Sequence, residues 1–270
     1  MAFIFDHLVH FVEDPKVAIE ELESYGIHAV EGGVHEKRGT YNTLSYFDLS
    51  YIEFLGTYDR TLVEQTEHLP NSLQETIVLD RFAEGFSRFA VRTTNINKDA
   101  EKFREKGLKV NGPVPYSRKR PDGSLIEWQL LFVGDDQNEL QLPFIIQWHD
   151  SDEVRRNEQI KKGVIVEHPA GIAFSHVMFA VKDVDYAIEK WSNLLELKAG
   201  DVYIDDKLQA KCQTLELEGG NLVFCSPIGD GIVSETLEKR GEKPFQVNFS
   251  GGSSNLTFEL LGGVYNIINS

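Results

Sequence analysis

Two histidines lie three positions apart near the start of the chain, in the segment FDHLVHF at residues 5–11. A neutral imidazole is the commonest metal ligand, and it also serves as a general acid or base near neutral pH. The segment alternates like a β-strand, so successive side chains point to opposite faces. His7 therefore shares a face with Val9 and Phe11, whereas His10 lies on the other face. At most one of the two histidines can face a cleft.

The composition is that of a folded, acidic protein. Of 270 residues, 41% are hydrophobic and 26% are charged, and the formal net charge is −16. Such a surface repels nucleic acid and anionic membranes, so we predict neither as a partner and expect a small-molecule ligand. The opening residues do not resemble a signal peptide, and no apolar run approaches the roughly 20 residues that span a bilayer. We therefore expect a cytoplasmic protein.

The chain has two cysteines, Cys212 and Cys225. A secreted scaffold held together by disulfides would need more of them. Free cysteine behaves as a small buried hydrophobic residue. We therefore expect two reduced thiols inside neighbouring strands.

Three segments of the chain begin alike. Each starts with an alternating strand, continues through a polar turn into an amphipathic helix, and is followed by short strand-like stretches. The segments are DHLVHFVEDPKVAIEELESYGI (6–27), SRFAVRTTNINKDAEKFREKGL (87–108) and SHVMFAVKDVDYAIEKWSNLLEL (175–197). The repeat predicts an α+β protein built from βαβββ modules.

The modules divide the chain into a long N-terminal domain and a shorter C-terminal part. We predict one domain over residues 1–148, with modules at about 1–59 and 85–148. A helical insert fills residues 60–84, where Ser72 and Glu75 have the spacing of a capping box. The predicted boundaries continue with a charged linker at 149–170 and a third βαβββ-like module at 171–270.

The motifs DHLVH, HEKRGTYNTLSYF and YIEFLG resemble the glyoxalase-like branch of the vicinal oxygen chelate superfamily. The resemblance implies two βαβββ modules that pair into a curved mixed sheet around a cleft, with a third related module after them. The superfamily includes isomerases, lyases, dioxygenases and metal-free drug-binding proteins. It therefore implies either a metal-dependent enzyme or a small-molecule binding protein of the bleomycin-resistance type, acting on a small polar or anionic molecule.

In this superfamily, a histidine of the first strand and a glutamate of the fourth strand of a module bind the metal. His7 and Glu53 occupy these positions. The resemblance thus implies a divalent zinc, manganese, iron or nickel ion, which imidazole and carboxylate ligands suit. If other groups hold the ion, Glu53 is free to act as a catalytic general base.

The second module departs from this pattern. Aligned on the first module, it places Arg88 opposite His7 and Gln141 approximately opposite Glu53. Arginine stays protonated and cannot bind a metal. His35 is a candidate third ligand, which would complete a set of two histidines and one carboxylate. The alternative is that His35 merely caps the neighbouring turn.

The remaining polar candidates would bind the substrate. Arg88, if it faces the cleft, would pair with Glu53 or with an anionic ligand; the alternative is an arginine on the surface. Asn42 and His35 flank a turn and could also contact the ligand. Trp128 lies on an alternating strand, either as a cleft wall with an indole donor or as an aromatic core residue.

The third module keeps the histidine but not the carboxylate. His176 stands at the position of His7, whereas Val223 stands at that of Glu53. We therefore expect His176 to be a packed strand histidine. Because a third module has no partner within the chain, we predict that it mediates a homodimer.

Overall fold

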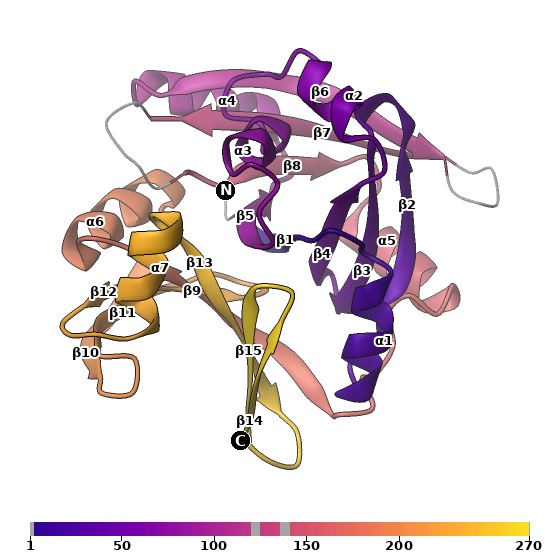
Figure 1. The fold of residues 1–270 in the computed structure, drawn as a ribbon. Helices are drawn as coiled ribbons and strands as arrows, with labels where there is room; N and C mark the ends of the chain where they lie inside the picture. The colour runs from indigo at the N-terminus through magenta and orange to yellow at the C-terminus, as the bar shows by residue number, and fades with distance from the viewer. Residues whose placement is uncertain (1–2, 120–124, 136–140, 270) are drawn as a thin grey trace.

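The computed structural model describes residues 3–119, 125–135 and 141–269, and in these residues the strands form two curved mixed sheets, of eight and seven strands (Figure 1). The first sheet has, in spatial order, β2 (Val30–His35), β3 (Thr40–Phe47), β4 (Ser50–Thr57), β1 (Ile4–Phe11), β5 (Gly85–Arg92), β8 (Phe144–Trp148), β7 (Leu125–Gly134) and β6 (Lys109–Lys119). β1 pairs parallel with β4 and antiparallel with β5. Two βαβββ modules therefore meet along β1 and β5, which confirms the predicted fold class.

The second sheet repeats this arrangement. Its order is β10 (Lys198–Asp205), β11 (Ala210–Glu216), β12 (Asn221–Pro227), β9 (Ile172–Ala180), β13 (Lys243–Gly251), β15 (Gly263–Ile268) and β14 (Leu256–Leu260). β9 pairs parallel with β12 and antiparallel with β13, as β1 does with β4 and β5. The strands β13, β14 and β15 form a shortened fourth module, so the expectation that the third module lacks a partner within the chain is wrong. The predicted homodimer stays a prediction.

The helices cover the sheets and connect the modules. They are α1 (Val17–Ser24), α2 (Arg60–Gln65), α3 (Leu73–Leu79), α4 (Ile96–Glu105), α5 (Asp152–Lys161), α6 (Val184–Leu195) and α7 (Ile232–Arg240), with a 3-10 turn η1 at Glu36–Arg38. The predicted cap is present, because Ser72 Oγ accepts from the backbone N–H of Glu75 at the start of α3. The segment predicted as a linker contains α5.

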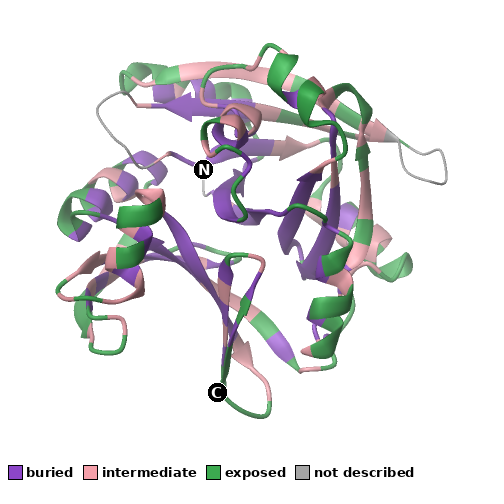
Figure 2. Ribbon diagram, in the orientation of Figure 1, coloured by how far each residue is buried: buried purple, intermediate pink, exposed green. Residues whose placement is uncertain are grey.

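A shared aromatic core holds the two sheets together. The ring of Phe5 in the first sheet lies 4.9 Å from that of Phe174 in the second, measured between ring centroids. The rings of Phe89 and Phe179 make the same kind of contact at 5.3 Å. Helices α1, α4 and α6 contribute to this cluster, and Figure 2 shows the buried strands between them. Tilted and edge contacts of this kind add to the hydrophobic burial of the rings. The strand positions that face this core are therefore unavailable to a ligand.

The two opening histidines point to opposite faces of β1, as the alternation predicts. His10 lies in the aromatic core, where Nδ1 is 2.6 Å from the Tyr265 hydroxyl and Nε2 is 2.8 Å from the Leu261 carbonyl oxygen. His7 lies on the other face, with Val9 and Phe11 beyond it. His10 is thus a buried link between the sheets.

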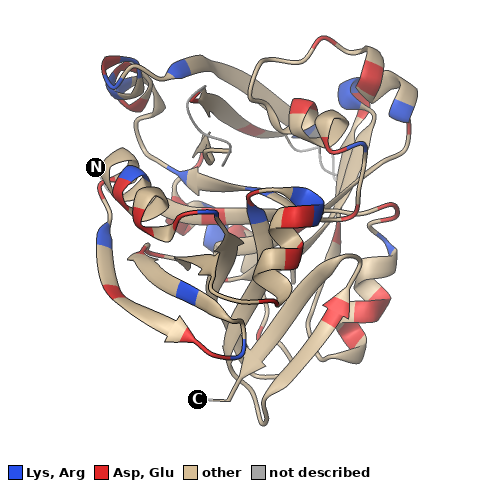
Figure 3. Cartoon of the chain, turned by 60° about the vertical axis from the view of Figure 1, so that its left-hand side comes forward, with Lys and Arg blue, Asp and Glu red and all other residues tan. Residues whose placement is uncertain are grey.

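Figure 3 shows acidic residues on several helices and strands of both halves of the molecule. Among the described residues, no helix is long and apolar enough to cross a membrane.

Acid should destabilise the protein through His10. Burial lowers the pKa of His10 from its ordinary value of 6.5 to about 3, so the folded state keeps this ring neutral. The contribution of the neutral His10 ring to the free energy of unfolding is fully present above pH 6.5. It is lost as the pH falls toward the folded-state pKa, because the ring then binds a proton in the unfolded state but not in the folded state. In urea titrations from pH 6.5 to pH 4, we expect His10→Gln to flatten the fall in unfolding free energy by about 1 kcal/mol per pH unit.

Exposed His149 supplies the matched control for this experiment. The variant His149→Gln should keep the wild-type pH dependence. Equal slopes in wild type and His10→Gln would contradict the assignment of His10 as an acid-sensitive group.

Candidate functional site

A cavity opens on the face of the first sheet that points away from the aromatic core. Its volume is about 110 Å³, several times the roughly 30 Å³ that a water molecule takes in the liquid. Strands from both modules line it, and α5 contributes Arg155, Glu158 and Gln159. Five of the predicted site residues line this cavity: His7, His35, Asn42, Glu53 and Trp128.

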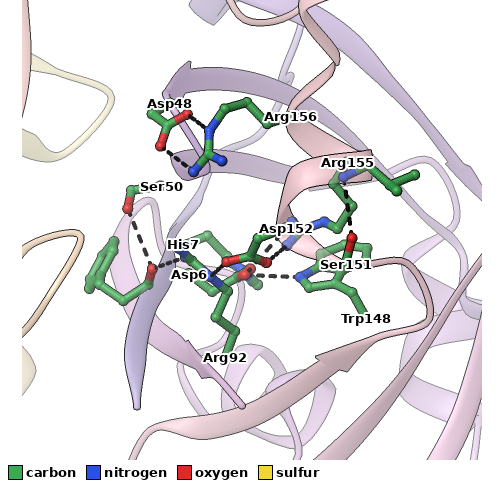
Figure 4. Close-up of polar contacts among 12 residues, drawn as sticks. Asp6, His7, Asp48, Ser50, Arg92, Trp148, Ser151, Asp152, Arg155 and Arg156 are labelled. Carbon is green, nitrogen blue, oxygen red and sulfur yellow. Dashed lines mark hydrogen bonds and ion pairs between the residues drawn. The ribbon is translucent and has the colours of Figure 1, made fainter. Parts of the chain in front are cut away.

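A β-bulge in β1 brings a carboxylate to His7. Phe5 pairs with Val91 and His7 pairs with Ala90, so Asp6 is an extra residue in β1. The Asp6 side chain therefore joins His7, and Oδ1 is 2.7 Å from His7 Nδ1 (Figure 4). Without the bulge, strict alternation would have turned Asp6 toward the aromatic core.

The Asp6 carboxylate is fully buried and held from several sides. The Trp148 indole N–H donates to Oδ2 at 2.9 Å, and an Arg155 nitrogen lies 3.9 Å from the same oxygen (Figure 4). Burial acts to raise the pKa of Asp6, but the hydrogen bond from His7 and the charge of Arg155 outweigh it, and the pKa is lowered. An ionised Asp6 accepts a hydrogen bond from His7 Nδ1–H, which fixes the ring with its Nε2 atom toward Glu53.

Glu53 lies on the cavity side of His7. Its Oε2 is 3.6 Å from His7 Nε2, and its Oε1 accepts a 2.5 Å hydrogen bond from the Asn42 amide. Asn42 Oδ1 in turn accepts from the backbone N–H of Gly33 at 2.9 Å and from Arg118 at 3.3 Å. The polar side chains thus form a continuous chain from buried Asp6 to Arg118.

His35 lies near this chain but is turned toward its own hairpin. Its Nδ1 is 3.0 Å from the Thr40 hydroxyl, across the turn that joins β2 to β3. Burial lowers the pKa of His35 to about 4, although the charge of Glu53 opposes this. The ring is therefore neutral at pH 7, and it is available as a hydrogen-bonding wall of the cavity.

The donors in the cleft fall short of a resident metal site. His7 and Glu53 supply suitable atoms, and Asp6 and Asn42 hold them as outer-shell partners usually do. Residues 3–119, 125–135 and 141–269 contain no group of three or more His, Cys, Asp or Glu side chains that could hold an ion. Catalytic sites of this kind need three protein ligands. The metal predicted at His7 and Glu53, with His35 as third ligand, therefore lacks a complete donor set.

Arg88 does face the same side of the sheet as His7, but it is enclosed. Its guanidinium donates to the backbone carbonyl groups of Asn71 and, at 2.5 Å, Leu142, and it lies 5.7 Å from the Phe144 ring. Burial lowers the pKa of Arg88 to about 10. Arg88 is not among the described residues that line the cavity, and its role in ligand binding stays a prediction.

The strand register corrects one alignment. Val9 pairs with Glu53 between β1 and β4, whereas Ala90 pairs with Phe144 between β5 and β8. Phe144, and not Gln141, therefore occupies the position of Glu53 in the second module. The second module thus has an aromatic ring where the first has a carboxylate. The ring of Phe144 packs beside His7, with 5.3 Å between the two ring centroids.

Several cavity residues escaped the sequence analysis. Arg38 lies 3.9 Å over the Tyr116 ring, and Arg155 lies 4.1 Å over the Trp148 ring, which itself neighbours Trp128. These arginines come from η1 and α5, and Arg118 comes from β6, so no local spacing signals them. Asp6 was visible, because it immediately precedes His7, but only the bulge explains its contact.

The glyoxalase-like domain family model matches residues 5–195. A crystal structure of a hypothetical protein from Staphylococcus aureus is similar over 98% of this chain and 99% of that one, with 20% identity and a TM-score of 0.80. A triple mutant of 4-hydroxymandelate synthase from Streptomyces coelicolor covers 94% of this chain and 72% of that one, with 9% identity and a TM-score of 0.60. Methylmalonyl-CoA epimerase from the same organism gives 18% identity over 56% of this chain and 100% of that one, with a TM-score of 0.41. No curated protein matches the chain.

The family model covers more than half of the chain, which therefore belongs to the glyoxalase-like domain family, and the paired modules of the first sheet have the fold that the motifs imply. The resemblance in the motifs around His7 and Glu53 is thereby confirmed.

The incomplete donor set predicts weak metal retention. After purification without chelator and dialysis, we expect well below one zinc, manganese, iron or nickel ion per chain, because two ligands hold an ion loosely. Elemental analysis by mass spectrometry measures this directly. One ion per chain that disappears in both His7→Ala and Glu53→Ala, but persists in His149→Ala, would show that the cleft is a metal centre.

Proposed function

We propose that the cleft binds a small molecule with an oxyanion group and transfers a proton on it, as an isomerase or lyase does. One observation carries this proposal. Arg38 and Arg118 line the same small cavity as His7 and Glu53, whose side chains lie 3.6 Å apart between Nε2 and Oε2. Groups that could bind an anion therefore lie next to a pair of side chains that could transfer a proton.

The two arginines support an anionic ligand. In the described part of the chain, neither Arg38 nor Arg118 forms an ion pair with a carboxylate, although acidic residues outnumber basic ones 43 to 27 in the sequence. Arginine suits carboxylate and phosphate groups because its planar donors match two oxygen atoms at once. The negative net charge of the protein repels such a ligand, and the positive charges of Arg38 and Arg118 offset this repulsion within the cavity.

The pair of His7 and Glu53 supports proton transfer. Asn42 holds one oxygen atom of Glu53, which leaves Oε2 directed toward His7 Nε2 as the atom that takes the substrate proton. His7 can then share that proton, because ionised Asp6 stabilises a positive imidazole ring from behind. Trp128 and Trp148 form an aromatic wall that limits access of water.

A metal-dependent reaction is the second candidate. If a divalent ion bound here, His7 and Glu53 would hold it, and the ion would supply Lewis acidity to a substrate oxygen. The superfamily includes metal-dependent dioxygenases and epimerases, which favours the same view. The metal analysis described above separates the two candidates.

Removal of one arginine should weaken anion binding selectively. Pyruvate is a suitable probe, and its neutral amide, pyruvamide, serves as the comparison. Two of the three tryptophans line the cavity, so quenching of their fluorescence reports binding. We expect Arg118→Ala to raise the Kd for pyruvate about 10- to 100-fold, because a charge-assisted hydrogen bond contributes about 1.5–3 kcal/mol.

The exposed Arg104 on α4 supplies the control, and Arg104→Ala should leave the Kd unchanged. Pyruvamide should bind weakly to every variant. Equal affinity for pyruvate and pyruvamide in the wild type would show that the cleft does not select for negative charge.

Glu53 should be needed for proton transfer rather than for binding. In D₂O, the wild type should speed the exchange of the pyruvate methyl protons, which NMR measures. The variant Glu53→Gln should lose at least 100-fold of this rate, in the range of a general base, while pyruvate affinity stays within about threefold. Binding without any exchange in the wild type would instead indicate a sequestration protein.

A further inference from the structure

The two cysteines of the chain meet across a single pair of strands in the second sheet. Cys212 of β11 and Cys225 of β12 are directly opposite in an antiparallel ladder. Opposite residues in such a ladder have Cα atoms about 4.5–5.5 Å apart, which lies inside the range of about 4.4–6.8 Å that disulfides require. A bond between them therefore needs no movement of the backbone.

The sulfur atoms already touch. Cys212 Sγ and Cys225 Sγ are 3.1 Å apart, and both residues are fully buried. They lie with Met178 and Ala180 in an apolar cluster that Val233 of α7 covers. This cover keeps a second protein chain away from the thiols, whereas each thiol has the other within reach.

The pair lies close to the edge of the second sheet, with Cys212 one strand in from the edge strand β10. Tyr203 of the edge strand β10 is opposite Cys212, on the other side of β11, and its side chain is 41% exposed. Interaction with the Cys225 thiol lowers the pKa of Cys212, and interaction with Cys212 together with burial raises that of Cys225. Each thiol therefore affects the ionisation of the other.

We propose that Cys212 and Cys225 form a reversible disulfide that closes when the protein meets hydrogen peroxide. The thiolate of one cysteine attacks one peroxide oxygen and becomes a sulfenic acid, and the other oxygen leaves as water after taking up a proton. The thiol of the other cysteine then attacks this sulfur and displaces the hydroxyl group as a second water. Two thiols and one peroxide yield one disulfide and two waters, and a dithiol reverses the reaction by exchange.

This redox site is separate from the proposed cleft chemistry. The cleft lies in the first sheet and is lined by residues up to Gln159, whereas the thiols lie in the second. The outcome of a test of the disulfide therefore does not bear on the function proposed for the cleft. The expectation of two buried cysteines in neighbouring strands is confirmed, and the register adds that they are partners.

The test uses the full chain and its two cysteines. Native protein is treated with hydrogen peroxide, excess oxidant is removed, and the denatured chain is alkylated with iodoacetamide and weighed by intact mass spectrometry. We expect two alkyl groups per untreated chain, none after peroxide with the loss of two hydrogen atoms, and two again after dithiothreitol. A non-reducing gel should show monomer throughout.

The variants Cys212→Ser and Cys225→Ser serve as controls, with circular dichroism to confirm folding. Neither can lose two hydrogen atoms within one chain, and the remaining thiol should be alkylated or trapped by dimedone as a sulfenic acid. Retention of two alkylatable thiols in oxidised wild type, covalent dimers on the gel, or gain of oxygen without loss of hydrogen would overturn the proposal.

Discussion

The central strand β1 has to serve two environments at once, and the site depends on how it does so. One face enters the aromatic core between the two sheets, where His10 bonds to Tyr265. The other face carries His7 into the cavity. With strict alternation, Asp6 would point to the face opposite His7. The bulge at Asp6 turns its side chain to the cavity face, beside His7. The buried carboxylate and the imidazole are therefore a product of backbone geometry as well as of residue choice.

Buried charge is the second constraint on this region. A fully buried carboxylate is costly unless it is paired and hydrogen-bonded, and Asp6 has partners in His7, Trp148 and Arg155. Two of these come from β8 and α5, far along the chain. Asp152 accepts from Arg92 at 2.8 Å and from Arg155 at 3.2 Å, which joins α5 to β5 (Figure 4). Helix α5 thus helps to hold Asp6 and His7 in place.

The repeated modules use one fold position for different chemistry. The first-strand position holds histidine in modules one and three, and it was aligned with arginine in module two. The fourth-strand position holds Glu53, Phe144 and Val223 in turn. Only the first module combines an imidazole with a carboxylate. Because the second and third modules have an apolar residue where Glu53 stands, they have fewer possible metal donors, although their strands pair in the same way. In the third module, Ser175 contacts His176 as Asp6 contacts His7, without a charge.

Local patterns in the sequence determined the modules, the opposite orientations of His7 and His10, the capped helix α3 and the pairing of His7 with Glu53. These follow from strand and helix periodicity and from short motifs, which act over a few residues. Tertiary structure alone decided that Phe144 replaces a carboxylate, that a fourth module completes the second sheet, and that Arg38, Arg118 and Arg155 converge on the cleft. These depend on strand register and on contacts between distant segments, and a single bulge or a shift of three residues changes them without altering any local pattern.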